Sequence, residues 1–267
     1  MTWEEAVLWM RAQSAQADLV RSCFYDDPLL SAAERYWNST EWRAMREFLP
    51  RSRGTALDLG AGRGIASYAL ARDGWATTAL EPDPSPVTGT GAIRALALES
   101  GLSITVSEER GEHLPFDDDC FDLVLGRAVM HHAHDLRQFC KEAARVLAPG
   151  GIFIAAREHV VSSPGQLRSF LATHPLHRLY GGEHAYRLGE YLRAIRAAGL
   201  RLRRVLNPFA SDVNLFPDSR EALRRRIARR LGVRSDRMIP GRLLDLFGAL
   251  HREPGRLYTF VAIKSHA

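Results

Sequence analysis

The segment at residues 55–64, with the sequence TALDLGAGRG, constrains the fold more than any other part of the chain. A short apolar run ends at Leu59, and glycines follow at positions 60, 62 and 64. Glycine adopts backbone angles that other residues avoid, and it lets a ligand approach the main chain closely. We therefore expect a strand, a tight ligand-binding turn and the start of a helix in this segment.

Strand and helix patterns alternate along the chain from this turn to residue 156. Predicted helices separate the apolar segments, and residues 123–125 are apolar without interruption, as in a strand buried on both faces. Alternation of this kind predicts an α/β fold with a Rossmann-like, mostly parallel seven-stranded sheet and helices on both faces. The predicted strands are 55–59, 77–81, 103–107, 121–126, 152–156, 200–206 and 256–264.

Additional helical segments surround this core. Residues 1–53 contain two amphipathic patterns, at 2–22 and 29–48, which predict an N-terminal helical extension. The Rossmann-like core is predicted at 54–206, and its last strand at 256–267. Residues 207–255 predict a helical cap inserted before the last strand. We expect this segment, together with the loop-rich residues 160–187 and the N-terminal helices, to stand over the carboxyl edge of the sheet, form an acceptor pocket and exclude water.

The composition is that of a soluble globular protein. Hydrophobic residues make up 46% of the chain and no run of about 18 apolar residues is present, so we expect no membrane span. The N-terminus is acidic and helix-like, which argues against a secretory signal. Cys23, Cys120 and Cys140 show neither disulfide nor metal-ligand spacing, so we interpret them as buried, reduced thiols. These features predict a cytoplasmic protein.

The net charge of +5 conceals an uneven distribution. Residues 1–150 carry 15 Lys and Arg against 22 Asp and Glu, whereas residues 151–267 carry 21 against 9. A basic half of this kind can attract an anionic substrate, nucleic acid or a membrane surface. The arginines between positions 220 and 230 spread around one predicted helix, which favours a solvated helix over a phosphate-binding surface.

The glycine pattern also discriminates between cofactors. A dinucleotide fold has the pattern GxGxxG, but position 65 here is Ile, which disfavours an NAD site. Glu81 ends the second predicted strand, where a carboxylate can accept hydrogen bonds from both ribose hydroxyl groups of either NAD or S-adenosylmethionine. Glu81 alone therefore leaves both cofactors open.

Five segments taken together resemble the class I S-adenosylmethionine-dependent methyltransferases, of the methyltransferase-11 subgroup. The matching segments are ALDLGAGRG at 56–64, Glu81, GEHLPF at 111–116, FDLVLG at 121–126 and RVLAPGG at 145–151. The resemblance covers about residues 54–156. It implies that the cofactor is S-adenosyl-L-methionine.

The resemblance also implies roles for individual residues. Gly60, Gly62 and the loop backbone would bracket the methionine part of the cofactor, Asp58 would orient the loop or the ammonium group, and Glu81 would hold the ribose. The chain departs from its relatives at Arg110, where many carry an acid that bonds the adenine amino group. The predicted cofactor-binding residues are Asp58, Gly60, Ala61, Gly62, Glu81, Pro82, Gly111, Glu112, Arg127 and Ala128.

Methyl transfer from a sulfonium is an in-line displacement in which positioning of the acceptor supplies much of the catalysis. A general base is needed only if the attacking atom carries a proton. Histidines follow the fourth and fifth predicted strands, and we rank His132 and His159 first as catalytic residues. His131, His132 and His134 do not have the spacing of a zinc motif, so we predict no metal site.

The most consistent function is an S-adenosylmethionine-dependent methyltransferase that acts on a small-molecule acceptor. An RNA methyltransferase that uses the basic C-terminal half is an alternative, but aromatic residues are not interleaved with the arginines for base stacking. A non-catalytic S-adenosylmethionine-binding protein is another. We do not expect a nucleic acid partner, and the sequence is compatible with a homodimer.

Overall fold

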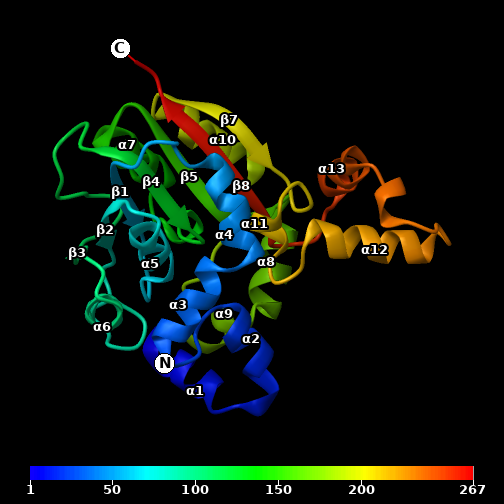
Figure 1. Cartoon of the computed structure of the whole chain (residues 1–267), viewed down its shortest axis with the longest axis horizontal. Helices are drawn as coiled ribbons and strands as arrows, with labels where there is room; N and C mark the ends of the chain where they lie inside the picture. The colour runs from blue at the N-terminus through cyan, green and yellow to red at the C-terminus, as the bar shows by residue number, and fades with distance from the viewer. Residues whose placement is uncertain (267) are drawn as a thin grey trace.

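The computed structural model describes residues 1–266, which form a mostly parallel sheet with helices on both faces (Figure 1). The strands lie in the order β3-β2-β1-β4-β5-β8-β7, and β6 pairs with β5 outside this path. The α/β fold class is confirmed, and the sheet gains an eighth strand because of the two-residue β6. Residue 267, the end of the last predicted segment, lies outside the described residues. The strands are β1 Thr55–Leu59, β2 Ala76–Leu80, β3 Ile104–Ser107, β4 Phe121–Arg127, β5 Leu147–Val161, β6 Tyr186–Arg187, β7 Leu200–Leu206 and β8 Arg256–Lys264.

The direction in which strands are added to the sheet reverses between β1 and β4. β1 pairs in parallel with both β2 and β4, and β4 pairs in parallel with β5. The chain thus builds one half of the sheet outward from β1 and then returns to begin the other half at β4. In open α/β sheets, ligands bind at the carboxyl ends of the strands at such a switch point. β8 runs antiparallel to its neighbours β5 and β7.

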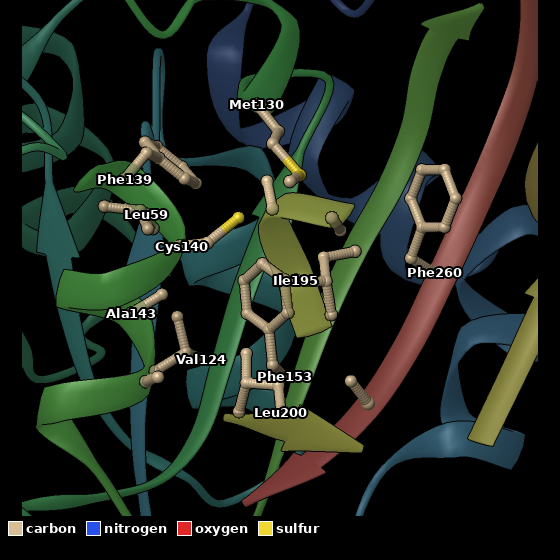
Figure 2. Close-up of a cluster of buried hydrophobic side chains, with 14 of the residues drawn as sticks. Leu59, Val124, Met130, Phe139, Cys140, Ala143, Phe153, Ile195, Leu200 and Phe260 are labelled. Carbon is tan, nitrogen blue, oxygen red and sulfur yellow. The ribbon is translucent and has the colours of Figure 1, made fainter. Parts of the chain in front are cut away.

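Two hydrophobic clusters pack against the two faces of the sheet. One cluster includes residues from α7 Leu136–Val146 and α10 Leu188–Ala197, and the other includes residues from α5 Ile65–Arg72. In Figure 2, Phe139 of α7 lies next to Leu59 of the sheet, and Ala143 of α7 lies next to Val124. α6 Thr90–Ser100 connects β2 to β3. No helix within residues 1–266 combines the length and apolar character needed to cross a membrane.

The N-terminal extension consists of short helices, whereas the sequence predicts two long ones. They are α1 Trp3–Arg11, α2 Ala17–Ser22, α3 Leu29–Trp37 and α4 Thr40–Met45. The second predicted helix is broken at Ser39, whose hydroxyl accepts a hydrogen bond of 3.0 Å from the backbone N–H of Trp42. Serine at this position starts a new helix because it satisfies a free N–H group of the first turn.

Asp73, which follows α5, joins this extension to the core. Its carboxylate accepts hydrogen bonds from Nε1 of Trp37 at 2.7 Å, Nε1 of Trp42 at 3.0 Å and Nε of Arg46 at 2.6 Å. Burial opposes ionisation, but the hydrogen bonds from Arg46, Trp37 and Trp42 prevail and lower the pKa of Asp73. The extension is therefore held by directional bonds as well as by apolar packing.

The inserted segment lies between β7 and β8, as predicted. It contains α11 Asp212–Leu215, α12 Arg220–Arg230 and α13 Gly241–Leu250. Its own small cluster of buried residues includes Ala228, Ile239 and Leu244. Figure 1 shows α12 and α13 projecting away from the sheet. This position bears on whether the segment covers a ligand site.

Candidate active site

A cavity of 880 Å³ lies at the carboxyl ends of β1, β2 and β4. All ten residues predicted to bind the cofactor line it, and so does His132. His159 is not among the lining residues within the described chain. The lining also includes residues that the sequence analysis did not select, among them Trp3, Cys23, Phe24, Tyr180 and Glu183.

The glycine-rich turn is fixed between β2 and the loop after β4. The backbone N–H groups of Gly60 and Ala61 donate to the carbonyl oxygen of Leu80 at 2.9 and 3.0 Å. Gly60 has a φ of +72°, and a Cβ atom there would lie 2.1 Å from Cγ2 of Val129. Both the backbone conformation and the neighbouring side chain therefore require glycine.

Glu81 follows β2 and is tied to the turn by hydrogen bonds. Its Oε2 accepts from the N–H of Gly62 at 2.8 Å, and its Oε1 accepts from the N–H of Asp83 at 3.1 Å. Burial raises the pKa of Glu81 to about 7. Since a carboxylate has about four acceptor sites, two remain for hydroxyl groups of a ligand.

Asp58, at the end of β1, offers a buried acceptor with no partner in the described chain. Its Oδ2 accepts a hydrogen bond of 2.5 Å from the hydroxyl of Ser67, whereas Oδ1 is buried and unbonded. Burial raises the pKa of Asp58 to about 6. A buried polar atom without a partner is costly. The ammonium group of a bound amino acid moiety would satisfy it.

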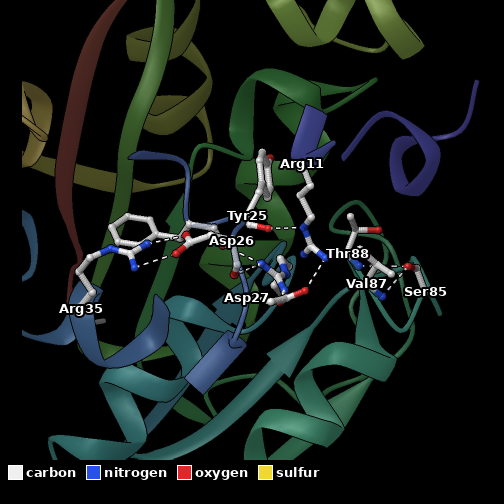
Figure 3. Close-up of polar contacts among 10 residues, drawn as sticks. Arg11, Tyr25, Asp26, Asp27, Arg35, Ser85, Val87 and Thr88 are labelled. Carbon is white, nitrogen blue, oxygen red and sulfur yellow. Dashed lines mark hydrogen bonds and ion pairs between the residues drawn. The ribbon is translucent and has the colours of Figure 1, made fainter. Parts of the chain in front are cut away.

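The segment between α2 and α3 is anchored to the glycine-rich turn by Arg63. Its guanidinium donates to the carbonyl oxygen of Phe24 at 2.9 Å and to Oδ1 of Asp27 at 2.5 Å. Figure 3 shows Arg11 of α1 reaching Tyr25 and Asp27 in the same network. The N-terminal extension thus supplies a wall of the cavity that is bonded directly to the turn.

Aromatic residues close the cavity on the side of this extension. The ring of Trp3 in α1 stacks on that of Tyr180, with centroids 6.3 Å apart, and meets the ring of Tyr25 edge-on at 6.2 Å. Tyr180 is the last residue of α9 Pro175–Tyr180. Within the described residues, none from 207–255 lines the cavity. The expectation that the inserted segment contributes to this pocket is therefore wrong, because α12 and α13 project away from it. The N-terminal helices and residues 160–187 do border the pocket, as expected, through Trp3 and Tyr180.

The guanidinium group of Arg127, at the end of β4, is paired with other side chains of the protein. Its guanidinium pairs with Glu41 of α4, with Nε 2.6 Å from Oε1, and lies 5.2 Å from the ring centroid of Tyr36. Glu41 and Tyr36 are both fully buried. Arg127 therefore lines the cavity without a free charged group, and the neighbouring Ala128 turns the chain with a φ of +55°.

Glu158, near the end of β5, holds the loop that follows β4. Its buried carboxylate accepts hydrogen bonds from the N–H groups of Val129, Met130 and His131 at 3.3, 3.1 and 2.9 Å. It also lies 2.7 Å from Nδ1 of His131. The pairing of β5 with β8 is irregular between Ala155 and Glu158, and bulges of this kind redirect side chains near functional sites.

Four groups from three segments meet at the inner wall of the cavity, which His132 and Glu183 line. Nε2 of His131 lies 3.6 Å from Oε2 of Glu183, and Nε2 of His132 lies 3.9 Å from the same oxygen. The rings of His131 and His159 are 4.8 Å apart between centroids. Burial lowers the pKa of His131, but Glu158 and Glu183 outweigh this effect and raise it to about 9. Burial and the neighbouring His131 lower the pKa of His132.

The two predicted catalytic histidines differ in position. His132 lines the cavity, and its Nδ1 lies 3.0 Å from the carbonyl oxygen of Gly182. His159 is packed between His131 and Phe170, and burial, with a smaller contribution from His131, lowers its pKa to about 3. His159 is therefore poorly placed to accept a proton from a ligand in the cavity. Glu158 and Glu183 were missed, although each directly precedes a histidine in the sequence.

The chain is similar in sequence to known methyltransferases. A family model described as "Methyltransferase domain" matches residues 57–155. A ubiquinone biosynthesis O-methyltransferase from Agrobacterium fabrum is 31% identical over 170 residues, which cover 61% of this chain and 67% of that protein. The protein of the same description from Rhizobium leguminosarum is 29% identical over 170 residues, covering 61% of this chain and 66% of that protein. The chain thus spans slightly less than two thirds of the latter's length.

Solved structures extend the likeness to most of the chain. The geranyl diphosphate C-methyltransferase from Streptomyces coelicolor, in complex with Mg²⁺, geranyl diphosphate and S-adenosyl-L-homocysteine, matches with a TM-score of 0.60. The sequences are 13% identical, and the match covers 90% of this chain and 85% of the other. At this identity the likeness establishes the fold alone.

Proposed function

Because this chain belongs to the class I S-adenosylmethionine-dependent methyltransferases, we propose that it methylates a hydroxyl group of a small molecule. The cofactor of the family is S-adenosyl-L-methionine. The hydroxyl acceptor is inferred from the curated relatives, which are described as O-methyltransferases.

The unbonded Oδ1 of Asp58 in the cavity is the observation that carries this proposal. An ammonium group next to Asp58 would satisfy this oxygen, and the ribose hydroxyls would donate to the two free acceptor sites of Glu81. Gly60, Ala61 and Gly62 would lie along the methionine chain. Gly111 borders the cavity farther along, and a Cβ there would lie 2.6 Å from Cε2 of Phe139. This residue set supports S-adenosylmethionine as the cofactor.

When bound, S-adenosylmethionine supplies a methyl group on a sulfonium, and its thioether product is a neutral leaving group. The acceptor oxygen must lose its proton as its new bond to carbon forms. His132 is suited to take this proton because it lines the cavity. Since the carbonyl oxygen of Gly182 can only accept, Nδ1 of His132 carries the hydrogen, which leaves the Nε2 lone pair available.

The arginines of the inserted segment do not favour an RNA acceptor. Several of them are paired with acids of the same segment. Nη1 of Arg220 lies 2.9 Å from Oδ1 of Asp245, Arg226 pairs with Asp218, and Arg225 pairs with Glu221. These pairs reduce the positive charge available to phosphates. The pairs agree with a solvated helix.

Calorimetric titration of the purified chain with S-adenosyl-L-homocysteine tests the cofactor site, and a methyl-transfer assay tests the chemistry. We expect one molecule of S-adenosyl-L-homocysteine to bind per chain. We also expect the chain to transfer labelled methyl groups to at least one member of a panel of phenols and catechols. Cofactor binding without transfer to any hydroxyl compound would contradict the proposed acceptor class, and absence of binding would contradict the function as a whole.

A further inference from the structure

We propose that His131, His159 and Glu183 form a binding site for a divalent transition-metal ion at the inner wall of the cavity. The ligand atoms that these residues offer all lie within 4.8 Å of one another. Only the catalytic role of this metal site rests on the proposed function. Metal binding itself can be measured without a methyl acceptor.

The three ligands come from segments that are far apart in sequence. His131 follows β4, His159 lies near the end of the adjacent strand β5, and Glu183 lies in the loop between α9 and β6. This origin explains why the spacing of neighbouring histidines predicts no metal site. The 3.6 Å between Nε2 of His131 and Oε2 of Glu183 is already close to the separation of about 3.3 Å for ligands on a tetrahedral zinc ion.

Hydrogen bonds orient the imidazole rings of His131 and His159 for metal binding. Nδ1 of His159 lies 2.8 Å from the carbonyl oxygen of Gly255, so Nδ1 must donate and Nε2 is left with a free lone pair. Nδ1 of His131 faces the carboxylate of Glu158 at 2.7 Å, which likewise directs its Nε2 toward Glu183. A carboxylate or carbonyl on the far nitrogen is the usual outer partner of a metal-binding histidine.

The charges of the cluster also favour a cation. The side chains of Glu158 and Glu183 are almost completely buried. Within residues 1–266, neither forms an ion pair with a lysine or an arginine, and their charged partners are histidines. Buried carboxylates are costly unless positive charge balances them. A divalent ion between Glu183 and the two histidines would supply that charge in place of a proton on His131.

The donor set indicates the kind of metal. Two imidazoles and one carboxylate suit Zn²⁺ or Fe²⁺, whereas Mg²⁺ and Ca²⁺ prefer oxygen ligands. Three protein ligands are also the number found in catalytic zinc sites, which leave a position open for water or substrate.

Glu183 connects this site to the cavity that it lines. A metal ion bound there would adjoin His132, whose Nε2 lies 3.9 Å from Oε2 of Glu183. An acceptor hydroxyl bound to the ion would lose its proton more easily, because a divalent cation stabilises the oxyanion. The metal ion would thus bring the acceptor oxygen next to the proposed base.

The test is equilibrium dialysis of the chelator-treated full chain against Zn²⁺, with the visible spectrum of bound Co²⁺ as a second readout. We expect one ion per chain. We also expect the absorption bands of bound Co²⁺ to be those of an ion with a low coordination number. Glu183→Gln and His159→Gln should each weaken Zn²⁺ binding by more than about tenfold. His113→Gln, which removes an exposed histidine, should bind as the unmodified chain does.

The possible outcomes separate the metal-site proposal from the proposed methyltransferase function. Circular dichroism of the metal-free variants checks that they fold, and His159→Gln leaves the cavity lining intact. Zn²⁺ affinity that is equal in the unmodified chain and in both cluster variants would overturn the metal site, as would the absence of stoichiometric binding. Zn²⁺ binding by a chain that fails to bind S-adenosyl-L-homocysteine would support the metal site and contradict the methyltransferase function.

Discussion

The backbone N–H of Gly62 donates a hydrogen bond of 2.8 Å to Oε2 of Glu81. This bond joins the glycine-rich turn after β1 to the acid that follows β2. The turn predicted to hold the methionine part of the cofactor and the acid predicted to hold its ribose are therefore bonded to each other. Changes at either residue should affect the whole cofactor site.

Glu81→Gln should weaken binding of S-adenosyl-L-homocysteine by roughly 10- to 100-fold, the range expected for lost hydrogen bonds to a charged group. The glutamine amide has only one acceptor oxygen, so its NH₂ group must face either the N–H of Gly62 or that of Asp83. Calorimetric titration measures the affinity. Glu99→Gln, which changes an exposed carboxylate on α6, serves as the control and should bind normally. Unchanged affinity in Glu81→Gln would refute the ribose assignment.

The affinity for S-adenosyl-L-homocysteine should increase from about pH 6 to about pH 8, because Glu81 has a pKa of about 7 and binds ribose hydroxyls best when ionised. The folded pKa of Glu81 is raised above its unfolded value. Its contribution to stability is therefore present at low pH and is lost as the pH rises through about 7. Bound hydroxyl groups offset this loss. Titrations at several pH values measure the trend, and a flat profile in the unmodified chain would contradict it.

Gly60→Ala should reduce both stability and cofactor affinity, whereas Gly101→Ala should reduce stability alone, and by less than Gly60→Ala does. Both glycines have positive φ angles, +72° and +67°. A Cβ at Gly60 would lie 2.1 Å from Cγ2 of Val129, but a Cβ at Gly101 would meet no atom within 4 Å. The left-handed conformation alone costs about 1–2 kcal/mol. Thermal unfolding of the two variants separates this cost from the steric clash, and equal destabilisation would exclude a contribution from Val129.

Asp73→Asn should destabilise the chain at neutral pH by roughly 2 kcal/mol, the scale of hydrogen bonds to a charged group. The folded pKa of Asp73 is lowered, so its stabilising contribution is present above the unfolded pKa and is lost as the pH falls through the folded value. The difference from the unmodified chain should therefore shrink in acid. Chemical unfolding at neutral and acidic pH measures it, with the exposed Asp18→Asn as control. A difference that does not depend on pH would argue against the carboxylate.

The parallel sheet, and the place of Gly60, Gly62 and Glu81 in the cavity lining, were predictable because their signals are local. Gly60, Gly62 and Glu81 lie beside the strands that position them, so apolar runs and glycine spacing suffice. The bounds of β5 were harder to predict from the sequence. The sequence predicts 152–156, but Leu147 already pairs with Phe121 of β4, and Val160 still pairs with Arg256 of β8. These pairings depend on neighbouring strands rather than on local propensity.

The N-terminal helices and residues 160–187 were expected at the cavity, but the side chains that they place there were not predictable, because those positions depend on tertiary contacts. Trp3 reaches the cavity through its contacts with Tyr180 and Tyr25, which belong to other segments. Glu183 meets His131 and His132 only after the chain has folded. The helical insertion before the last strand was expected from the sequence, but nothing in its own sequence reveals that α12 and α13 point away from the cavity.

A crystal structure of the chain with bound S-adenosyl-L-homocysteine tests the central claim most directly. We expect the ribose hydroxyls to donate to Glu81, the ammonium group to bond Oδ1 of Asp58, and the sulfur to face the part of the cavity lined by His132 and Glu183. A complex in which the ligand leaves Oδ1 of Asp58 and the carboxylate of Glu81 without contacts would contradict it.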